Sequence, residues 1–158
     1  MINFSTLLAA LGCGLIAGLF FAFSTAVMTA LGRLPPAQGI AAMQSINVVI
    51  LNPVFLTVFF GTAVICLFLA ITALPRWHDP SARYLIAGSV LYLVGSILVT
   101  MLFNVPRNNL LASLQPQSAQ AAAVWSDYLR SWTAWNHVRT VASLAAAAAF
   151  TLARASVP

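Results

Sequence analysis

Three polar residues close together near the C-terminal end have side chains that could do chemistry. Asn136, His137 and Arg139 lie within the sequence WNHVRT, which opens a long apolar stretch. An imidazole can act as a general base near neutral pH, a guanidinium group can hold an anion, and an amide can both donate and accept hydrogen bonds. If a helix enters the membrane near Trp132, Arg139 lies about two turns inside it, roughly 10 Å.

The chain offers few acidic partners to a cation at that depth. It contains seven arginines and only two acids, Asp79 and Asp127. Asp127 lies three residues before Arg130, and this spacing predicts an ion pair on one helix. Arg107 and Arg139 are therefore predicted to lack a carboxylate partner. An anionic ligand, a lipid phosphate, or snorkelling to water are the explanations that remain open.

Aromatic and polar residues share one predicted helical face. Trp125, Trp132, Asn136 and Arg139 follow one another at spacings of seven, four and three, which places them on the same side of a helix. Such a face should point inward, and aromatic rings beside polar anchors suit a flat aromatic ligand. A tryptophan belt at the membrane interface is the alternative.

Membrane helices must position these residues. The chain has 158 residues, of which 61% are hydrophobic and 6% charged, whereas about a quarter of a soluble domain is charged. The sequence therefore predicts an all-α fold: a four-transmembrane-helix bundle forming a single integral membrane domain over residues 1–158. Its helices 2 and 4 are expected to extend into a cap on one side. The predicted spans cover residues 4–31, 53–74, 84–103 and 132–154, and the predicted interfacial helical segments cover 37–52 and 117–131.

Prolines and glycines refine this layout. Pro53 is expected to kink the second helix, and Pro106 to stop the third one within NVPRNN. Gly14 and Gly18 belong to a row of small residues on the first helix, which predicts close packing within the bundle. A homo-oligomer formed through the same face is the alternative.

The polar residues of all four helices are expected to gather at one end of the bundle. The candidate site residues are Asn47, Asn52, Asn104, Arg107, Asn108, Trp132, Trp135, Asn136, His137 and Arg139. Amides in lipid need hydrogen-bond partners, so capping of helix ends around Pro53 and Pro106 is the alternative to a site. A lone histidine without carboxylate or thiolate neighbours makes a poor metal site, so no metal and no cofactor are predicted.

Three segments together resemble a known family. GLFFAFSTAVMTALGRLP, NVPRNNL and WNHVRT are similar to sequences of the anthrone oxygenase-like family of small four-helix membrane proteins. The resemblance implies cofactor-independent oxidation by O₂ of a flat hydrophobic aromatic substrate, an anthrone, to an anthraquinone. Polyketide tailoring is the implied context.

The resemblance also implies roles for the candidate residues. His137 would be the base, and Arg107 and Arg139 would supply positive potential to a developing oxyanion. Amides would hold the oxyanion and phenolic oxygens, and tryptophans would pack on the rings. His137, Arg139 and Asn108 are thus the expected catalytic residues, and the expected substrate-binding residues are Asn47, Asn52, Asn104, Arg107, Trp132, Trp135 and Asn136.

A non-catalytic membrane protein remains the alternative: one that binds a lipid or a quinone, or a small transporter or accessory subunit. Polarity at only one end argues against a pore. The arginines are scattered singly, which argues against nucleic acid as a partner. Their distribution favours a multi-pass protein of the cell membrane with cytoplasmic termini.

Overall fold

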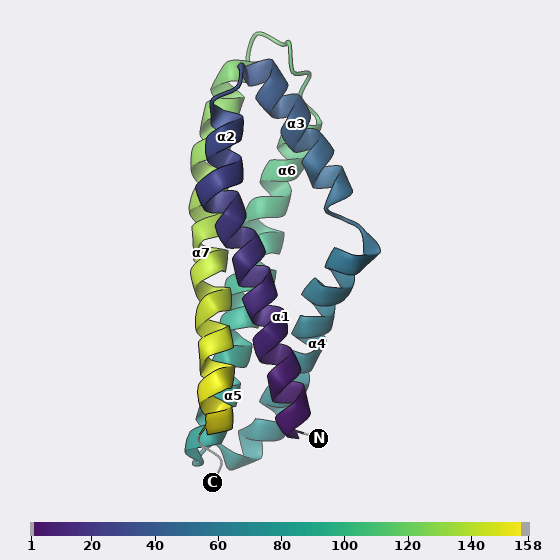
Figure 1. Cartoon of the computed structure of the whole chain (residues 1–158). Coiled ribbons are helices and arrows are strands. Elements are labelled where there is room, and N and C mark those ends of the chain that lie inside the picture. The colour runs from purple at the N-terminus through teal and green to yellow at the C-terminus, as the bar shows by residue number, and fades with distance from the viewer. Residues whose placement is uncertain (1, 156–158) are drawn as a thin grey trace.

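A computed structural model describes residues 2–155, and all regular structure in that range is helical. Four long helical columns stand side by side (Figure 1). The elements in chain order are α1 (Ile2–Ala22), η1 (Phe23–Val27), α2 (Met28–Gly32), α3 (Pro36–Val49), α4 (Pro53–Ala73), η2 (Leu74–Arg76), α5 (Pro80–Tyr92), η3 (Leu93–Leu98), η4 (Thr100–Asn104), α6 (Val105–Ala112) and α7 (Ala121–Ala155). η1, η3 and η4 are π-helical turns, and η2 is a 3₁₀ turn.

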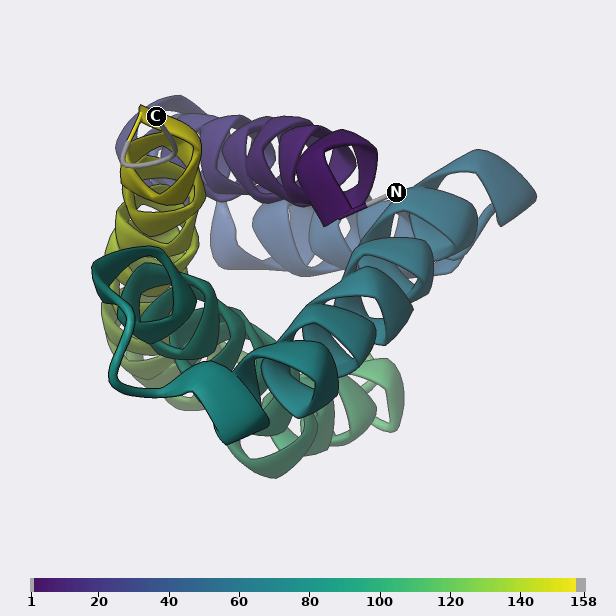
Figure 2. The ribbon, with the colours of Figure 1, turned by 90° about the horizontal axis from the view of Figure 1, so that it is seen from below.

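The columns form a closed ring. Seen along the bundle, α7 packs between α1 and α5, and α4 closes the ring between α5 and α1 (Figure 2). The two ends of the described chain meet, since Arg154 Nη1 donates a hydrogen bond to the Asn3 carbonyl at 2.8 Å. We call this the terminal end, and the opposite one, which carries α3, α6 and the loop 113–120, the cap end.

Four helical stretches are long and apolar enough to cross a membrane. They are Asn3–Gly32, Pro53–Arg76, Pro80–Ala112 and Ala121–Ala155. The prediction of an all-α bundle with four such helices is confirmed, and the arrangement is consistent with a multi-pass membrane protein. α3 and the first turns of α7 lie beyond the core of the ring, at the cap end (Figure 1).

Pro53 does more than kink the second helix. The helix breaks fully, because residues 50–52 are non-helical between α3 and α4. Pro53 has no N–H to bond the Val49 carbonyl, and the Asn52 side chain replaces that donor, since its Nδ2 donates to the same carbonyl at 3.1 Å. Asn52 Oδ1 also accepts from the Phe55 N–H at 3.0 Å and so caps α4. The break is therefore stabilised from both sides.

The predicted end of the third helix at residue 103 was wrong. The helical path continues through η3 and η4 into α6 and ends only at Ala112. Pro106 lies in the first turn of α6, directly after the π-helical turn η4. A π turn already departs from the α-helical bonding pattern, and a proline in a first turn removes no intrahelical bond. The proline is therefore tolerated.

The predicted helical segment 117–131 begins too early. Residues 113–120 form a loop, and α7 begins at Ala121. Successive turns bond the Ser118 N–H to the Gln115 carbonyl and the Ala121 N–H to the Ser118 carbonyl. Ala121 is the first side chain of this stretch that is buried in the bundle, so the helix starts where packing starts.

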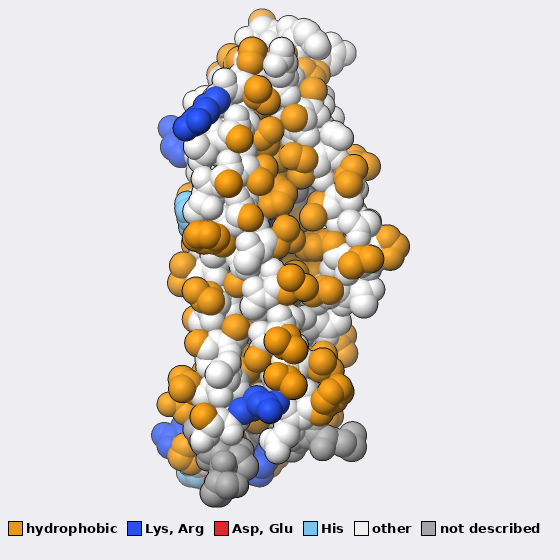
Figure 3. All heavy atoms as spheres, in the orientation of Figure 1, with side chains coloured by type: hydrophobic (Ala, Val, Ile, Leu, Met, Phe, Trp, Pro, Cys, Tyr) orange, Lys and Arg blue, Asp and Glu red, His pale blue; other side chains and the backbone are white. Residues whose placement is uncertain are grey.

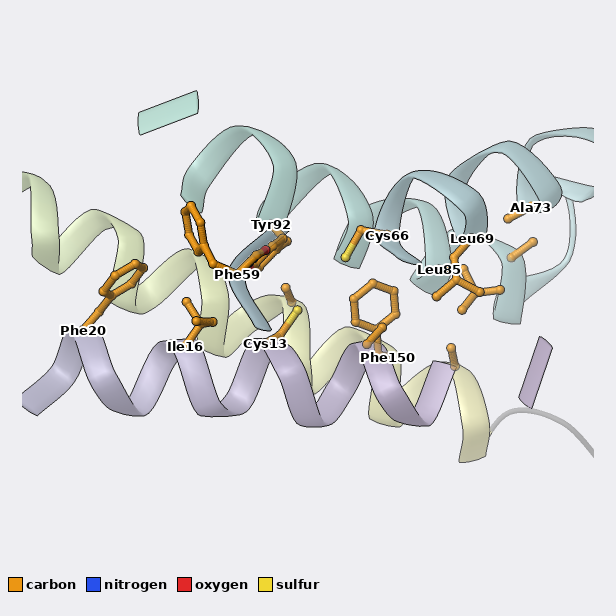
Figure 4. Packing of buried hydrophobic residues seen from close by; sticks show 14 residues of the cluster. Cys13, Ile16, Phe20, Phe59, Cys66, Leu69, Ala73, Leu85, Tyr92 and Phe150 are labelled. Atoms are coloured by element: carbon orange, nitrogen blue, oxygen red, sulfur yellow. Dashed lines mark hydrogen bonds between the residues drawn. The ribbon is translucent and has the colours of Figure 1, made fainter. Parts of the chain in front are cut away.

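Apolar side chains fill the terminal half of the ring. Phe20, Ile16 and Cys13 of α1 face Phe59 and Cys66 of α4, with further members from α5 and α7 around them (Figure 4). Both cysteines are free and fully buried. They pack as small apolar side chains.

Gly14 and Gly18 do not pack within the bundle. A methyl group added to either would meet no atom within 4 Å, whereas one at Gly12 would lie 2.1 Å from Thr62 Oγ1. Gly12 therefore lets α1 approach α4. The expectation that the Gly14–Gly18 row packs closely within the bundle was wrong. Oligomerisation through that row stays a prediction.

Candidate functional site

A cavity lies in the cap half of the ring, beside the α3–α4 break. The empty space between its walls, with the open mouth included, is about 560 Å³. Its wall is mostly apolar and aromatic, with four polar side chains. The lining residues are Leu19, Phe20, Phe23, Met43, Ile46, Asn47, Ile50, Leu51, Phe55, Thr100, Val105, Asn108, Trp132 and Arg139.

Among the described residues that line this wall, Arg139 is the only one with a charged side chain. It is 5% exposed, and its Cζ atom stands 4.1 Å from the ring centroid of Phe20 and 5.2 Å from that of Trp132. Nη1 donates to Thr100 Oγ1 at 3.0 Å, and Nη2 donates to Asn136 Oδ1. Its Nε is buried without a hydrogen-bond partner among the described residues. The aromatic faces stabilise the cation but leave its charge unneutralised.

Asn136 sets the position of Arg139. Its side chain is completely buried, and its Nδ2 donates to the Phe20 carbonyl at 2.7 Å and to Ser24 Oγ at 2.6 Å. Both donor positions are thus used on the first column, which turns Oδ1 toward the guanidinium group. Phe20 lies just before the π-helical turn η1, and Ser24 lies within it.

A second polar group closes the cap side of the cavity. Asn108 Oδ1 accepts one hydrogen bond from Tyr128 Oη and one from Trp132 Nε1, each at 2.8 Å. These bonds join α6 to α7 and fix the indole ring whose face lies beside Arg139. Asn47 of α3 also lines the cavity, and its buried Nδ2 has no hydrogen-bond partner in the part of the chain that is described.

The structure brings four of the ten predicted residues to the cavity wall: Asn47, Asn108, Trp132 and Arg139. Asn136 and Asn104 lie behind the wall. Asn104 is buried, and its Nδ2 donates to the Trp132 carbonyl at 3.2 Å, which ties η4 to α7. It thereby holds the backbone of Trp132.

Asn52 and Arg107 lie away from the cavity. Asn52 is exposed and caps α4. Arg107 Nε donates to Ser131 Oγ at 2.9 Å, and its Nη1 donates to the Phe103 carbonyl at 2.7 Å. It lies in a separate surface groove that Asp127 and Tyr128 also line. For Asn52 the structure shows the capping role that was the alternative, and Arg107 ties α6 to α7.

His137 and Trp135 do not face the cavity either. His137 is exposed and follows Asn136, the fully buried residue of the inner face. One residue turns a helix by about 100°, so neighbours cannot share a face. The ring of Trp135 stacks on Phe103 at a centroid distance of 3.6 Å and does not line the cavity. The structure therefore gives no support to His137 as the base or to Trp135 as a substrate contact.

Sequence reasoning missed several residues of the wall. Thr100 is the most important, because its hydroxyl accepts from Arg139 and donates to the Ser96 carbonyl at 2.7 Å. A signal existed, since Thr100, Asn104 and Asn108 recur every four residues along one face. The aromatic and aliphatic part of the wall carried no such signal, because phenylalanine and isoleucine occur throughout the chain.

The electrostatics follow the expectation for the two acids. Asp127 pairs with Arg130 at 2.7 Å on the outer surface of α7, and Asp79 precedes α5 at the terminal end. No carboxylate therefore reaches Arg107 or Arg139 within the described chain. Among residues 2–155, no three His, Cys, Asp or Glu side chains gather where they could hold one metal ion.

Comparison with known proteins adds the family. The sequence profile of the anthrone oxygenase family matches residues 55–149, which is more than half of the chain and runs from the first turn of α4 into the last two turns of α7. No curated protein and no solved structure matches the chain. The matched range contains most of the polar cavity wall, including Thr100, Asn108 and Arg139. The chain belongs to the anthrone oxygenase family.

Proposed function

We propose that this chain is a membrane-embedded oxygenase that oxidises flat, hydrophobic, anthrone-like substrates with O₂. The cavity would hold the ring system between aromatic side chains, with the substrate oxygen at Arg139. The reaction needs one O₂ for each anthrone and yields an anthraquinone and water.

One observation carries the proposal: a buried guanidinium group without a carboxylate partner stands on the wall of an aromatic cavity. An uncompensated cation in an apolar setting favours a ligand that can carry negative charge. A deprotonated anthrone has that property, because its charge lies largely on the ring oxygen. Asn136 and Thr100 hold the guanidinium in place before the ligand arrives, and this is the condition for effective electrostatic stabilisation.

The proposed reaction proceeds through the anthrone anion. Loss of the methylene proton at C10 gives an electron-rich anion, which passes one electron to O₂. The resulting radical and superoxide join through a new carbon–oxygen bond at C10, and the peroxide takes up a proton. The O–O bond then breaks as the remaining C10 hydrogen leaves as a proton, so that water departs and a second carbonyl group forms.

The wall offers no side-chain base for the first proton. Arg139 is the only titratable group among the lining residues of the described chain. We therefore assign the proton to water, and assign to Arg139 the lowering of the substrate's pKa by stabilisation of its anion. This replaces the histidine base expected from the sequence.

The lack of a base is also the observation that favours a second candidate function. A protein that only binds a quinone or a related lipid needs a hydrogen-bond donor for a carbonyl oxygen and an apolar slot, and this cavity has both. Such a protein would bind anthraquinones without consuming O₂ in the presence of anthrones.

Turnover distinguishes the two candidates. The purified chain in phosphatidylcholine nanodiscs would be mixed with anthrone, and O₂ uptake and anthraquinone absorbance would be followed together. We expect both to exceed the rate in empty nanodiscs, with one O₂ consumed for each anthraquinone formed. Binding of an anthraquinone without any rate above the empty nanodiscs would favour the non-catalytic function.

The orientation of the protein belongs to the same proposal. Arg107 and Arg139 are held by side chains of the bundle, and Arg130 pairs with Asp127. Arg33 then remains at the cap end, without an ion pair among the described residues, whereas Arg76, Arg83 and Arg154 lie at the terminal end. By the positive-inside rule we place the termini in the cytoplasm and the chain in the cell membrane.

A further inference from the structure

We propose that the cavity exchanges its ligand with the hydrocarbon phase of the membrane, through a sideways opening at the α3–α4 break. The partner on this surface is thus the lipid itself, with the flat ligand dissolved in it. The class of ligand rests on the proposed function, but the position of the opening does not.

The exposed members of the cavity wall locate the opening. Leu51 lies in the break and is 62% exposed, and Val105 at the start of α6 is 40% exposed. Both line the cavity and reach the outer surface, and Leu51 belongs to the segment between α3 and α4, where the chain bulges away from the bundle (Figure 1). The space-filling view shows a recess bordered by hydrophobic side chains between α1 and this point (Figure 3).

The rim around Leu51 is made of exposed apolar side chains. Val48, Val49 and Val54 flank the break and are 74%, 67% and 76% exposed. Met101 and Leu102, close to Val105, are also exposed. A run of large apolar side chains in contact with water is unfavourable, whereas lipid chains solvate it at no cost. The opening therefore suits the hydrocarbon phase.

The depth of the opening agrees with this assignment. Pro53 and Arg76 are the ends of a 24-residue helical span, which is roughly 36 Å long. A tilted helix of that length reaches across about 30 Å of hydrocarbon. Arg139 lies fifteen residues before Arg154 on α7, roughly 22 Å along the helix axis. Cavity and opening thus lie within, or at the cap-side edge of, the hydrocarbon.

Side-chain hydrogen bonds hold the break that makes the opening. Asn52 bonds both the end of α3 and the start of α4, and Gln44 Nε2 ties α3 to the end of α6 through the carbonyls of Leu111 and Leu114 at 2.8 and 2.9 Å. α3 is thereby fixed over the cap end, and the space beside Leu51 stays free of packing. A continuous straight helix would have closed it.

The polarity of the cavity sets the direction of entry. Three of its polar groups, Arg139, Thr100 and Asn108, belong to the third and fourth columns, and Asn47 belongs to α3, whereas the side chains that border the mouth at the break are apolar: Ile50, Leu51 and Phe55. A ligand arriving from the lipid would enter with its oxygen-bearing edge first and leave its apolar edge at the mouth.

A spin label at position 51 tests the environment of the opening directly. Leu51→Cys would be labelled in phosphatidylcholine vesicles, and its collisions with O₂, which dissolves in lipid, would be compared with those with a water-soluble nickel chelate. Val64→Cys on the outside of α4 is the lipid reference, and Gln117→Cys in the loop at the cap end is the water reference. The unaltered chain, whose two cysteines are fully buried, is the labelling blank.

We expect O₂ to be the dominant collision partner of the label at position 51, as it is at position 64. A nickel response equal to that at position 117 would overturn the proposal, because the cavity would then open to water. This result does not depend on any ligand.

Binding kinetics test the route itself. Proteoliposomes would be mixed with vesicles that carry 1,8-dihydroxyanthraquinone, and binding would be followed through the fluorescence of this probe. Val54→Trp narrows the mouth at its rim without changing a residue of the cavity wall, and Val64→Trp adds the same bulk to another exposed position on α4. A residue on the route should lower the association and dissociation rate constants by the same factor and leave Kd unchanged.

Unchanged rate constants in Val54→Trp, or an altered Kd with unchanged association, would contradict the route. If the unaltered chain does not bind the probe at all, the proposed ligand class fails. In that case the spin-label measurement decides on the opening by itself.

Discussion

Asn136 and Arg139 lie one helical turn apart on α7, and the amide oxygen of Asn136 accepts a hydrogen bond from the guanidinium group of Arg139. The amide nitrogen of the same side chain bonds the Phe20 carbonyl and the Ser24 hydroxyl on the first column. A neutral acceptor therefore fixes the cation without cancelling its charge. A carboxylate in this position would fix it equally well and neutralise it.

Asn136→Asp tests this distinction. The change replaces the amide donor by a carboxylate, which would form an ion pair with Arg139. We therefore expect Kd for the 1,8-dihydroxyanthraquinone anion to rise about tenfold or more, which is a loss of about 1.4 kcal/mol or more in binding free energy. Ser24→Ala is the control, because it removes one link of Asn136 and leaves the charge of Arg139 free. Equal affinities of the two variants would show that the charge of Arg139 does not bind the ligand.

Asn108→Ala should destabilise the fold. The change leaves two donors, Tyr128 Oη and Trp132 Nε1, without their acceptor. Each unsatisfied group costs about 1–3 kcal/mol, so we expect a loss of about 2–4 kcal/mol in unfolding by denaturant in detergent micelles. Asn109→Ala, next to it but exposed, should change stability little. A similar loss in both variants would mean that the shared acceptor is unimportant.

The glycines of α1 should differ sharply. A methyl group at Gly12 meets Thr62 at 2.1 Å, and one at Gly18 meets nothing. Gly12→Ala should therefore lower the unfolding free energy by about 1–3 kcal/mol, whereas Gly18→Ala should leave it unchanged or raise it by up to about 1 kcal/mol. Thermal unfolding in micelles measures both. A loss at Gly18 that depends on protein concentration would instead indicate a helix contact between two copies.

His137→Ala should leave oxidation of anthrone unchanged. The side chain is exposed and does not line the cavity, so it cannot reach the C10 proton. The pH profile and the rate of O₂ uptake in nanodiscs measure the effect. A loss of about a hundredfold, the usual contribution of a general base, would restore the role expected for His137 from the sequence.

The inner face of the last helix could be predicted from the sequence. The outward orientation of His137 could have been predicted in the same way. Trp125, Trp132, Asn136 and Arg139 all share the buried face that their spacing indicates. The same geometry places His137 about 100° away from Asn136, so the two adjacent residues could not both serve one site. Their closeness within WNHVRT placed both in one hypothesis.

The π-helical turns could not be predicted, and they shape the site. η1 and η4 carry or adjoin the groups that Asn136 and Arg139 bond, namely the Phe20 carbonyl, Ser24 and Thr100. A π turn adds a residue to a helical turn and shifts all later side chains around the axis. No residue type signals a π turn, so a plain helical pattern misplaces the side chains beyond it. For the same reason the sequence did not show that the helix continues through Pro106.

The free cation on the cavity wall is the central claim, and the pKa of a bound phenol tests it most directly. The absorbance of 1,8-dihydroxyanthraquinone reports its ionisation and would be titrated with pH in nanodiscs that hold the unaltered chain, Arg139→Met or Arg107→Met. Arg107 lies outside the cavity and serves as the matched control. If Arg139 stabilises the anion, the pKa of the bound phenol should be higher with Arg139→Met than with either the unaltered chain or Arg107→Met. We expect a difference of about one pKa unit or more, which is about 1.4 kcal/mol of anion stabilisation. The same pKa in all three samples would contradict the account.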